Sequence, residues 1–323
     1  MLVEQLKPIW HALQKAQRIA IFTHTNPDGD ALGSSFGMKA VLESLGKQAV
    51  LFLETELPER FSYLNDGYSL TGEAADFDTA LALDCGALNR LGSLKDFFLS
   101  IDCKVVLDHH RADAPFGDVY LTEPMAAACC ELTYMLSKML TENLPHKAVV
   151  AFYTGLSTDT GHFKYSNVSV RTFTIAAELL ACGLDQRAIT RHLYDTVKLK
   201  KLKFTGAVAE RIRVFHDGKI GVLHCPDSFI EAYDLAHEEL EELPNTVLSV
   251  EGVEVSVLIK DKEPGKLKVS LRCKENIDLA LLASEFGGGG HKCAAGFVTE
   301  LSQEVLEAKL IETIAKRLEE LDG

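Results

Sequence analysis

The sequence lacks three features that would each indicate a different class of protein. It has no apolar run of the roughly 20 residues that a helix needs to cross a bilayer. Its first ten residues include Glu4 and Lys7, which favours an amphipathic helix over a signal peptide. Its eight cysteines include no C-x-x-C pair. These absences predict a cytoplasmic protein with no membrane partner and no disulfide framework.

An excess of positive charge is also absent. The chain has 33 lysines and arginines against 47 aspartates and glutamates, a formal net charge of −14. A protein that binds long duplex nucleic acid usually presents a basic surface, so this charge argues against such a partner. A small phosphorylated substrate, held by metal ions and a few cations, remains compatible with it.

What is present is the composition of a globular protein, with 47% hydrophobic and 25% charged residues in a chain of 323. That length suits two hydrophobic cores better than one. Apolar patterning in the first part predicts strands at 19–23, 49–53, 80–83 and 105–107. It predicts helices at 3–16, 30–45, 94–99, 123–141, from 145 towards 158, and at 170–180. Strands alternating with helices predict an α/β fold with a mostly parallel sheet flanked by helices.

A second pattern follows a lysine-bearing stretch at residues 196–213, which we interpret as an exposed linker helix. Strands are expected at 219–224, 253–259 and 266–272, and helices at 279–286 and 303–318. Pro264-Gly265 predicts a hairpin turn between the last two strands. This part is therefore expected to form a smaller α/β domain.

The turn after the first expected strand carries His24, Asp28 and Asp30 within seven residues. One of the aspartates could simply cap the following helix, but capping leaves His24 unexplained. Carboxylate oxygens combined with imidazole suit manganese, magnesium, iron or zinc. The absence of cysteine ligands argues against a structural zinc.

Two further expected strands end in the same kinds of side chain. Asp84 follows strand 80–83, and Asp108-His109-His110 follows strand 105–107. The carboxyl ends of parallel strands meet at one edge of a sheet, so these groups are predicted to converge with the first turn. Taken alone, Asp108–His110 could be a structural or surface feature, and Asp159 could simply end a helix.

Together these residues resemble the DHH phosphoesterase superfamily over nearly the whole chain, and within it the bacterial nanoRNases. The likeness adds a glycine-rich motif from Gly287 to Gly296 to the motifs above. It implies a DHH catalytic domain at 1–194, a linker helix at 195–216 and a DHH-associated substrate-binding domain at 217–323. The site is expected in the cleft between the domains.

The resemblance also implies two divalent metal ions, with manganese favoured and magnesium, iron or cobalt as alternatives. One ion would be held by His24, Asp28 and Asp84. The other would be held by Asp30, Asp84, His109 and Asp159, so that Asp84 bridges the pair and is counted as catalytic. Asp108 would orient the histidines, and His110 would face the substrate phosphate. Such a pair of cations lowers the pKa of a water and offsets phosphate charge during hydrolysis.

In the second domain, the resemblance implies substrate contacts from Arg272, Gly288, Gly289, Gly290 and His291. Consecutive glycines allow backbone N–H groups to approach a phosphate. The alternatives are a flexible loop for the glycines and a plain surface cation for Arg272.

The implied activity is hydrolysis of very short oligoribonucleotides and removal of the 3′-phosphate from 3′-phosphoadenosine 5′-phosphate. Short RNA or nucleotides are thus the expected partners, and a homodimer is compatible with the sequence. The alternatives are a cyclic-dinucleotide or linear dinucleotide phosphodiesterase and an exopolyphosphatase or pyrophosphatase-like hydrolase. A nucleotide-binding regulator with a degenerate site is disfavoured because every expected ligand is present.

Overall fold

The computed structural model describes residues 2–73, 76–111, 114–235, 240, 242–274 and 277–322. The chain divides into two compact units, Met1–Thr196 and Val197–Gly323. Each unit builds a core around a sheet of its own.

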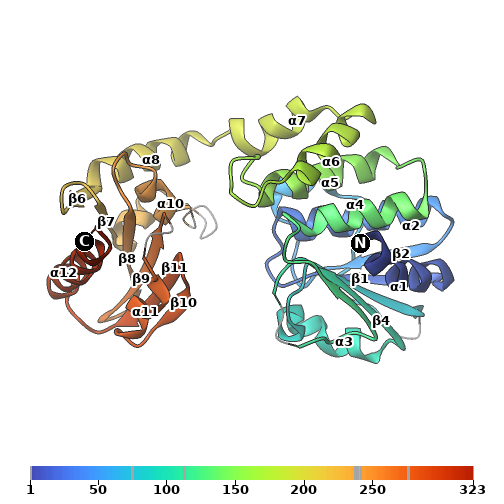
Figure 1. The fold of residues 1–323 in the computed structure, drawn as a ribbon, viewed down its shortest axis with the longest axis horizontal. Helices are drawn as coiled ribbons and strands as arrows, with labels where there is room; N and C mark the ends of the chain where they lie inside the picture. Colours follow the sequence, from blue (N-terminus) through green and yellow to red (C-terminus); the bar gives the residue numbers. More distant parts are fainter. Residues whose placement is uncertain are drawn as a thin grey trace. The chain divides into compact units, whose positions relative to one another are not determined.

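The first unit is organised around a five-stranded sheet in the order β2-β1-β3-β4-β5 (Figure 1). Its strands are β1 Arg18–Phe22, β2 Gln48–Phe52, β3 Thr79–Leu83, β4 Cys103–Asp108 and β5 Val119–Thr122. Every neighbouring pair is parallel, which confirms the predicted α/β class. The prediction missed β5, a short, half-buried strand with no clear apolar pattern.

Helices cover both faces of this sheet. The described helices are α1 Leu2–Lys15, α2 Gly29–Ser44, α3 Lys95–Ser100, α4 Cys129–Leu140, α5 His146–Asp159, α6 Val170–Ala181 and α7 Gln186–Thr190. Shorter helical turns are η1 Glu59–Leu64, η3 Leu88–Leu94 and η4 Arg191–Asp195. Ile19 and Ile21 of β1 pack in the core formed with α1, α2, α4 and α5, whereas Phe22 packs on the α3 side. This alternation follows from the two-residue period of a strand.

The strand order places β1 beside both β2 and β3. The chain leaves β1 for β2 on one side and then returns to β3 on the other. In open parallel sheets, ligands bind at the carboxyl edge where the order reverses in this way. His24 and Asp84, which follow β1 and β3, lie at that point.

The expected helix at 123–141 was wrong at its beginning. Helix α4 begins at Cys129, and Ala128 before it is extended, with φ −159° and ψ 153°. Residues 126–128 are buried but lie outside the helix. The helix begins where its first N–H groups meet the carboxylate of Asp30, and that partner comes from a distant part of the sequence.

The second unit contains a six-stranded sheet in the order β10-β11-β9-β8-β7-β6. Its strands are β6 Arg213–Phe215, β7 Ile220–Cys225, β8 Val255–Glu263, β9 Lys266–Cys273, β10 Gly289–His291 and β11 Ala294–Thr299. Only the β7–β8 pair is parallel among these pairings. Its helices are α8 Leu199–Arg211, α9 Asp227–Glu231, α10 Leu243–Leu248, α11 Leu279–Ser284 and α12 Gln303–Asp322.

The stretch interpreted as an exposed linker forms α8, whose Phe204 and Val208 are buried in a core cluster with β7 and β8. The glycine-rich motif is not a flexible loop throughout, because Gly289–His291 forms β10, paired antiparallel with Ala294–Gly296. The expected turn between β8 and β9 is present, with Gly265 at φ +80°.

All eight cysteines lie among the described residues, and none forms a disulfide. Within the described ranges, no helix combines the length and the apolar character needed to cross a membrane.

Helices α2 and α5 pack closely because glycines lie at their contact. A Cβ added at Gly33 of α2 would lie 2.5 Å from the Ala151 carbonyl oxygen and 2.8 Å from the Gly155 nitrogen. Both contacts are with backbone, which cannot move aside as a flexible side chain can. Since α2 carries Asp30 and α5 ends at Asp159, this packing sets how close those carboxylates lie.

We expect Gly33→Ala to lower the free energy of unfolding by about 1–3 kcal/mol, the usual cost of overpacking a core. Urea denaturation checks this. The matched control is Gly206→Ala, also within a helix but with no atom within 4 Å of an added Cβ. The control should stabilise the chain by about 0.5–1 kcal/mol, as alanine does over glycine within a helix. Equal effects of the two changes would contradict the proposed constraint.

Candidate metal centre

His24 follows β1 and is 5% exposed. Its Nδ1 lies 2.7 Å from the carbonyl oxygen of Thr25, which can only accept a hydrogen bond, so Nδ1 carries the proton in that contact. Its Nε2 faces two carboxylates, 3.7 Å from Asp84 Oδ2 and 3.9 Å from Asp28 Oδ2. In the neutral ring, the Nε2 lone pair is thus directed at these oxygens.

Asp28 has two separate contacts. Its Oδ1 caps helix α2, accepting the N–H groups of Asp30 and Ala31 at 3.0 Å each. Its Oδ2 is the atom facing His24. Capping therefore accounts for one oxygen of Asp28 and leaves the other beside an imidazole.

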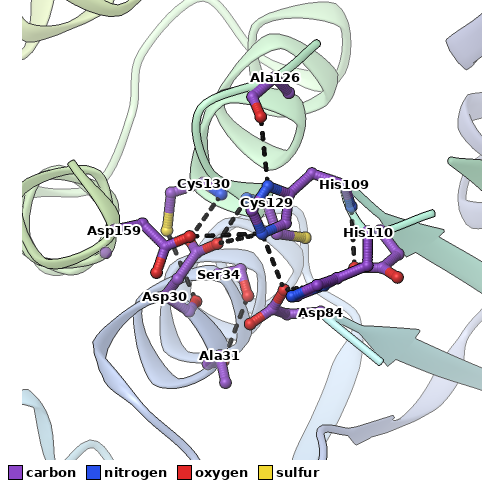
Figure 2. A network of polar contacts seen from close by, with 12 residues as sticks. Asp30, Ala31, Ser34, Asp84, His109, His110, Ala126, Cys129, Cys130 and Asp159 are labelled. Atoms are coloured by element: carbon purple, nitrogen blue, oxygen red, sulfur yellow. Dashed lines mark hydrogen bonds and ion pairs between the residues drawn. The ribbon is translucent and has the colours of Figure 1, made fainter. Parts of the chain in front are cut away.

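Asp30 lies in the first turn of α2 and is fully buried. Its carboxylate accepts the N–H of Cys129 at 2.5 Å and that of Cys130 at 2.8 Å (Figure 2). These are the first two residues of α4, and a helix N-terminus favours negative charge. Sequence reasoning missed this contact, for which the adjacent cysteines give no signal.

Asp84 lies between the histidines. It is 1% exposed, and its backbone adopts the left-handed region with φ +54°. Its Oδ1 lies 3.5 Å from His109 Nε2 and 3.4 Å from His110 Nδ1. Left-handed backbone at a residue other than glycine costs energy and is often found at functional sites.

Asp108 at the end of β4 accepts two hydrogen bonds on Oδ1, from the His109 N–H at 2.8 Å and from His110 Nδ1 at 2.9 Å. It thus contacts the ring of His110 but only the backbone of His109. The His109 ring is held instead by the Ala126 carbonyl, 3.2 Å from Nδ1. Figure 2 shows His109 Nε2 pointing among carboxylates: Asp159 at 3.3 Å, Asp84 at 3.5 Å and Asp30 at 3.7 Å.

This crowding shifts the pKa values of the carboxylates, but not all in the same direction. Burial, together with the nearby charges of Asp84 and Asp28, raises the pKa of Asp30 well above its ordinary value. Burial and the neighbouring carboxylates also raise the pKa of Asp159 to about 9. Burial alone would raise the pKa of Asp84, but the neighbouring imidazoles of His110, His24 and His109 outweigh it and hold that pKa well below the ordinary range. With a pKa of about 9, Asp159 keeps its proton at neutral pH when no cation is bound.

His110 and His24 have raised pKa values. The hydrogen bond to Asp108, and then the nearby carboxylate of Asp84, raise the pKa of His110 to about 10. For His24, burial acts to lower the pKa, but the nearby carboxylate of Asp84, the Thr25 carbonyl and Asp28 raise it overall.

These side chains fit divalent cations. Ligand atoms lie within 4.8 Å of one another in three groups: His24, Asp28 and Asp84; Asp30, His109 and Asp159; Asp84, Asp108, His109 and His110. Among the described residues, the buried His109 Nε2 and Asp84 Oδ1 have no hydrogen-bond partner. Buried polar atoms normally have a partner, and adjacent carboxylates repel one another. Bound cations would supply the missing partners and offset the repulsion.

The expected substrate residues lie in the second unit. Arg272 is on β9, and its Nη1 donates to the carbonyl of Leu271 at 2.9 Å. Gly289, Gly290 and His291 form the exposed strand β10, and Gly288 precedes it. The structure thus brings the eight expected residues of the first unit together and groups Arg272 with the glycine-rich motif in the other sheet.

Fold and site together define an α/β protein with a candidate metal centre at the carboxyl edge of a parallel sheet. Two family models match the chain: "DHH family, N-terminal domain" over residues 18–156 and "DHHA1 domain" over residues 227–320. A bifunctional oligoribonuclease and PAP phosphatase NrnA from Thermus thermophilus is 30% identical over 281 residues, covering 86% of this chain and 83% of the relative. The chain therefore belongs to the DHH family, which confirms the resemblance seen in the sequence.

Other similar proteins agree. A bifunctional oligoribonuclease and PAP phosphatase NrnA from Bacillus subtilis is 26% identical, covering 86% of this chain and 88% of the relative. The crystal structure of an exopolyphosphatase-related protein from Bacteroides fragilis has a TM-score of 0.86 at 26% identity, covering 99% of this chain and 98% of that one. The relatives from Thermus thermophilus and Bacillus subtilis are NrnA-type enzymes, and the DHH fold is consistent with a metal-dependent phosphoesterase.

Without divalent cations, we expect the free energy of unfolding to fall as the pH rises from about 5 to 9. The folded-state pKa of Asp159, about 9, lies above the roughly 3.9 of an unfolded aspartate. Between these values the folded state holds a proton that the unfolded state has lost, so stability decreases with pH. The raised pKa of His110 has the same sign above about 6.5.

Thermal unfolding in a chelator at several pH values checks this expectation. Asp159→Asn should flatten the dependence, because its amide does not titrate. Asp102→Asn is the matched control, since Asp102 is exposed and lies outside the ligand groups. Its curve should run parallel to that of the native chain. An Asp159→Asn curve as steep as the native one would contradict the assignment.

Proposed function

We propose that this protein is a two-metal phosphoesterase that hydrolyses very short oligoribonucleotides and removes the 3′-phosphate of 3′-phosphoadenosine 5′-phosphate. The observation that carries the proposal is that two sets of ligand atoms meet at one buried carboxylate, Asp84. The substrates come from the names of the NrnA relatives, which span most of this chain.

His24, Asp28 and Asp84 would hold one divalent ion, and Asp30, Asp84, His109 and Asp159 the other. The carboxylate and imidazole donors favour manganese, with magnesium, iron or cobalt as alternatives. When bound, such a pair lowers the pKa of a water and neutralises charge on the phosphate under attack.

The residues around these ligands have separate roles. Asp108 fixes the ring of His110 through Nδ1, and the raised pKa of His110 keeps its ring protonated and positive at neutral pH. The His110 side chain is 43% exposed, so it can meet a substrate phosphate oxygen. A fixed positive donor of this kind stabilises negative charge as it develops during hydrolysis.

In the second unit, Arg272 and the glycine-rich strand are the proposed substrate contacts. Val269, Leu271 and Cys273 of β9 pack in the core with α12, so the alternate residue Arg272 lies on the other face of the sheet. Its neighbour on β11 is Ala294, and Gly296 pairs with Ser270 on that face. The β11 residues beside Arg272 on this face are therefore small.

A substrate panel tests the function as a whole. The full chain loaded with Mn²⁺ should hydrolyse ribonucleotides two to five residues long and 3′-phosphoadenosine 5′-phosphate. Cyclic dinucleotides test one alternative, and pyrophosphate tests the pyrophosphatase-like alternative. Turnover of pyrophosphate alone would overturn the proposal.

Replacing Asp84 should remove the group shared by the two ions. We choose Asp84→Asn because asparagine tolerates the left-handed backbone at this position and removes only the charge. We expect kcat/KM to fall by about 100-fold or more, and calorimetry to show weaker Mn²⁺ binding. The control is Asp102→Asn, which should retain both properties. An active Asp84→Asn variant with native Mn²⁺ affinity would exclude the shared ligand.

Arg272→Gln tests the second unit. Because the guanidinium would bind substrate without holding a metal ion, we expect KM to rise about tenfold while Mn²⁺ affinity is unchanged. The control is Lys309→Gln on α12, which packs against the opposite face of the sheet. Native steady-state kinetics in Arg272→Gln would remove this residue from the mechanism.

A further inference from the structure

Residues 125–130, here called the bridge segment, contact two groups of the metal centre. The Ala126 carbonyl oxygen lies 3.2 Å from His109 Nδ1, and the N–H groups of Cys129 and Cys130 bind the carboxylate of Asp30 (Figure 2). Ala126 to Cys130 are all buried, at 4% exposure or less. A shift of the segment would therefore move both contacts together.

The contact with Ala126 determines which nitrogen of His109 can bind a cation. A carbonyl only accepts, so Nδ1 carries the proton and the Nε2 lone pair is left facing Asp159, Asp84 and Asp30. His24 obtains the same arrangement from the next residue in the chain. His109 depends on a carbonyl 17 residues away, whose position is set by tertiary structure.

Arg171 of α6 holds one end of the bridge segment. Its Nη2 donates to the Met125 carbonyl at 3.0 Å, and its Nε donates to Glu131 Oε2 at 2.7 Å. Glu131 is fully buried in the first turn of α4, and its other oxygen accepts the hydroxyl of Thr172. The planar guanidinium thus joins the segment before α4 to the helix itself.

Asn167 holds the middle of the segment. Its Nδ2 donates to the Ala127 carbonyl and to the backbone carbonyl of Asp159, at 3.0 Å each. A single amide therefore joins the segment that orients His109 to the residue whose carboxylate lies nearest to His109 Nε2.

We propose that Arg171 and Asn167 are positioning residues for the metal centre. By holding the carbonyls on either side of Ala126, they keep the Ala126 carbonyl on His109 Nδ1 and keep the N–H groups of α4 on Asp30. This role rests on the proposed two-metal function, since it concerns the same ligands. Neither side chain belongs to the ligand groups.

A purely structural role, in which these residues only join α4 to α6, makes a different prediction. Tyr134 of α4 and Glu178 of α6 form another hydrogen bond between the same helices, away from the bridge segment. Tyr134→Phe removes that bond and is the matched control.

The test compares Arg171→Met, Asn167→Ala and Tyr134→Phe in the full chain. Calorimetry with Mn²⁺ measures binding, and ¹⁵N NMR of the histidine rings in the metal-free protein measures the His109 tautomer. We expect Mn²⁺ affinity to fall about 10- to 100-fold in the first two variants, the usual effect of losing a group that orients a ligand. Their His109 Nδ1–H population should also fall, while Tyr134→Phe keeps native values of both.

Native affinity together with a native tautomer in Asn167→Ala would overturn the proposal. Asn167→Ala decides the question if Arg171→Met does not fold, because Asn167 is exposed and leaves Glu131 paired. An equal loss of affinity in Tyr134→Phe would also overturn it, in favour of the structural role. If the native chain binds no Mn²⁺, the proposed function fails, and the tautomer measurement still decides the positioning role.

Discussion

The repulsion among buried carboxylates is the constraint on which the first unit depends. Asp30, Asp84 and Asp159 all lie within 3.7 Å of His109 Nε2; Asp30 and Asp84 are shielded from bulk water, whereas the Asp159 side chain is 25% exposed. The fold compensates in part, through the N–H groups of α4 on Asp30 and the histidines around Asp84. In the metal-free protein, bound protons neutralise part of the remaining negative charge. Divalent cations would displace those protons when they bind.

Close packing holds these carboxylates near one another in spite of their repulsion. Gly33 lets α2 approach α5 so closely that one added methyl group would meet two backbone atoms of α5. The parallel sheet places the remaining side chains of the site, since β1, β3 and β4 end at the same edge beside the point where the strand order reverses. Helix contact and strand order thus bring together ligands that lie up to 135 positions apart, from His24 to Asp159.

Much of the site could be predicted from the sequence because most of its candidate metal ligands follow strands. A buried parallel strand is a strong local signal, and a polar cluster directly after it can only lie at the carboxyl edge. The same logic failed for residues 123–141, where apolar and small residues predicted a continuous helix. The actual beginning at Cys129 depends on Asp30, which no local pattern around Cys129 contains. Strands β5, β6, β10 and β11 were also missed. The first three have only four, three and three residues, and β11 begins within the glycine-rich motif and contains Gly296.

By itself the sequence determined the α/β class, the residues able to bind metal and the family, because these follow from periodicity and from motifs in a fixed order. Only the tertiary structure decided how each side chain is held. His24 finds its acceptor in the next residue, whereas the ring of His109 depends on Ala126, and Ala126 in turn on Arg171 and Asn167. The physical reason is the separation in sequence between the two partners of each contact. A carbonyl one residue away is fixed by local geometry, but one brought from another element is placed only when the whole unit packs.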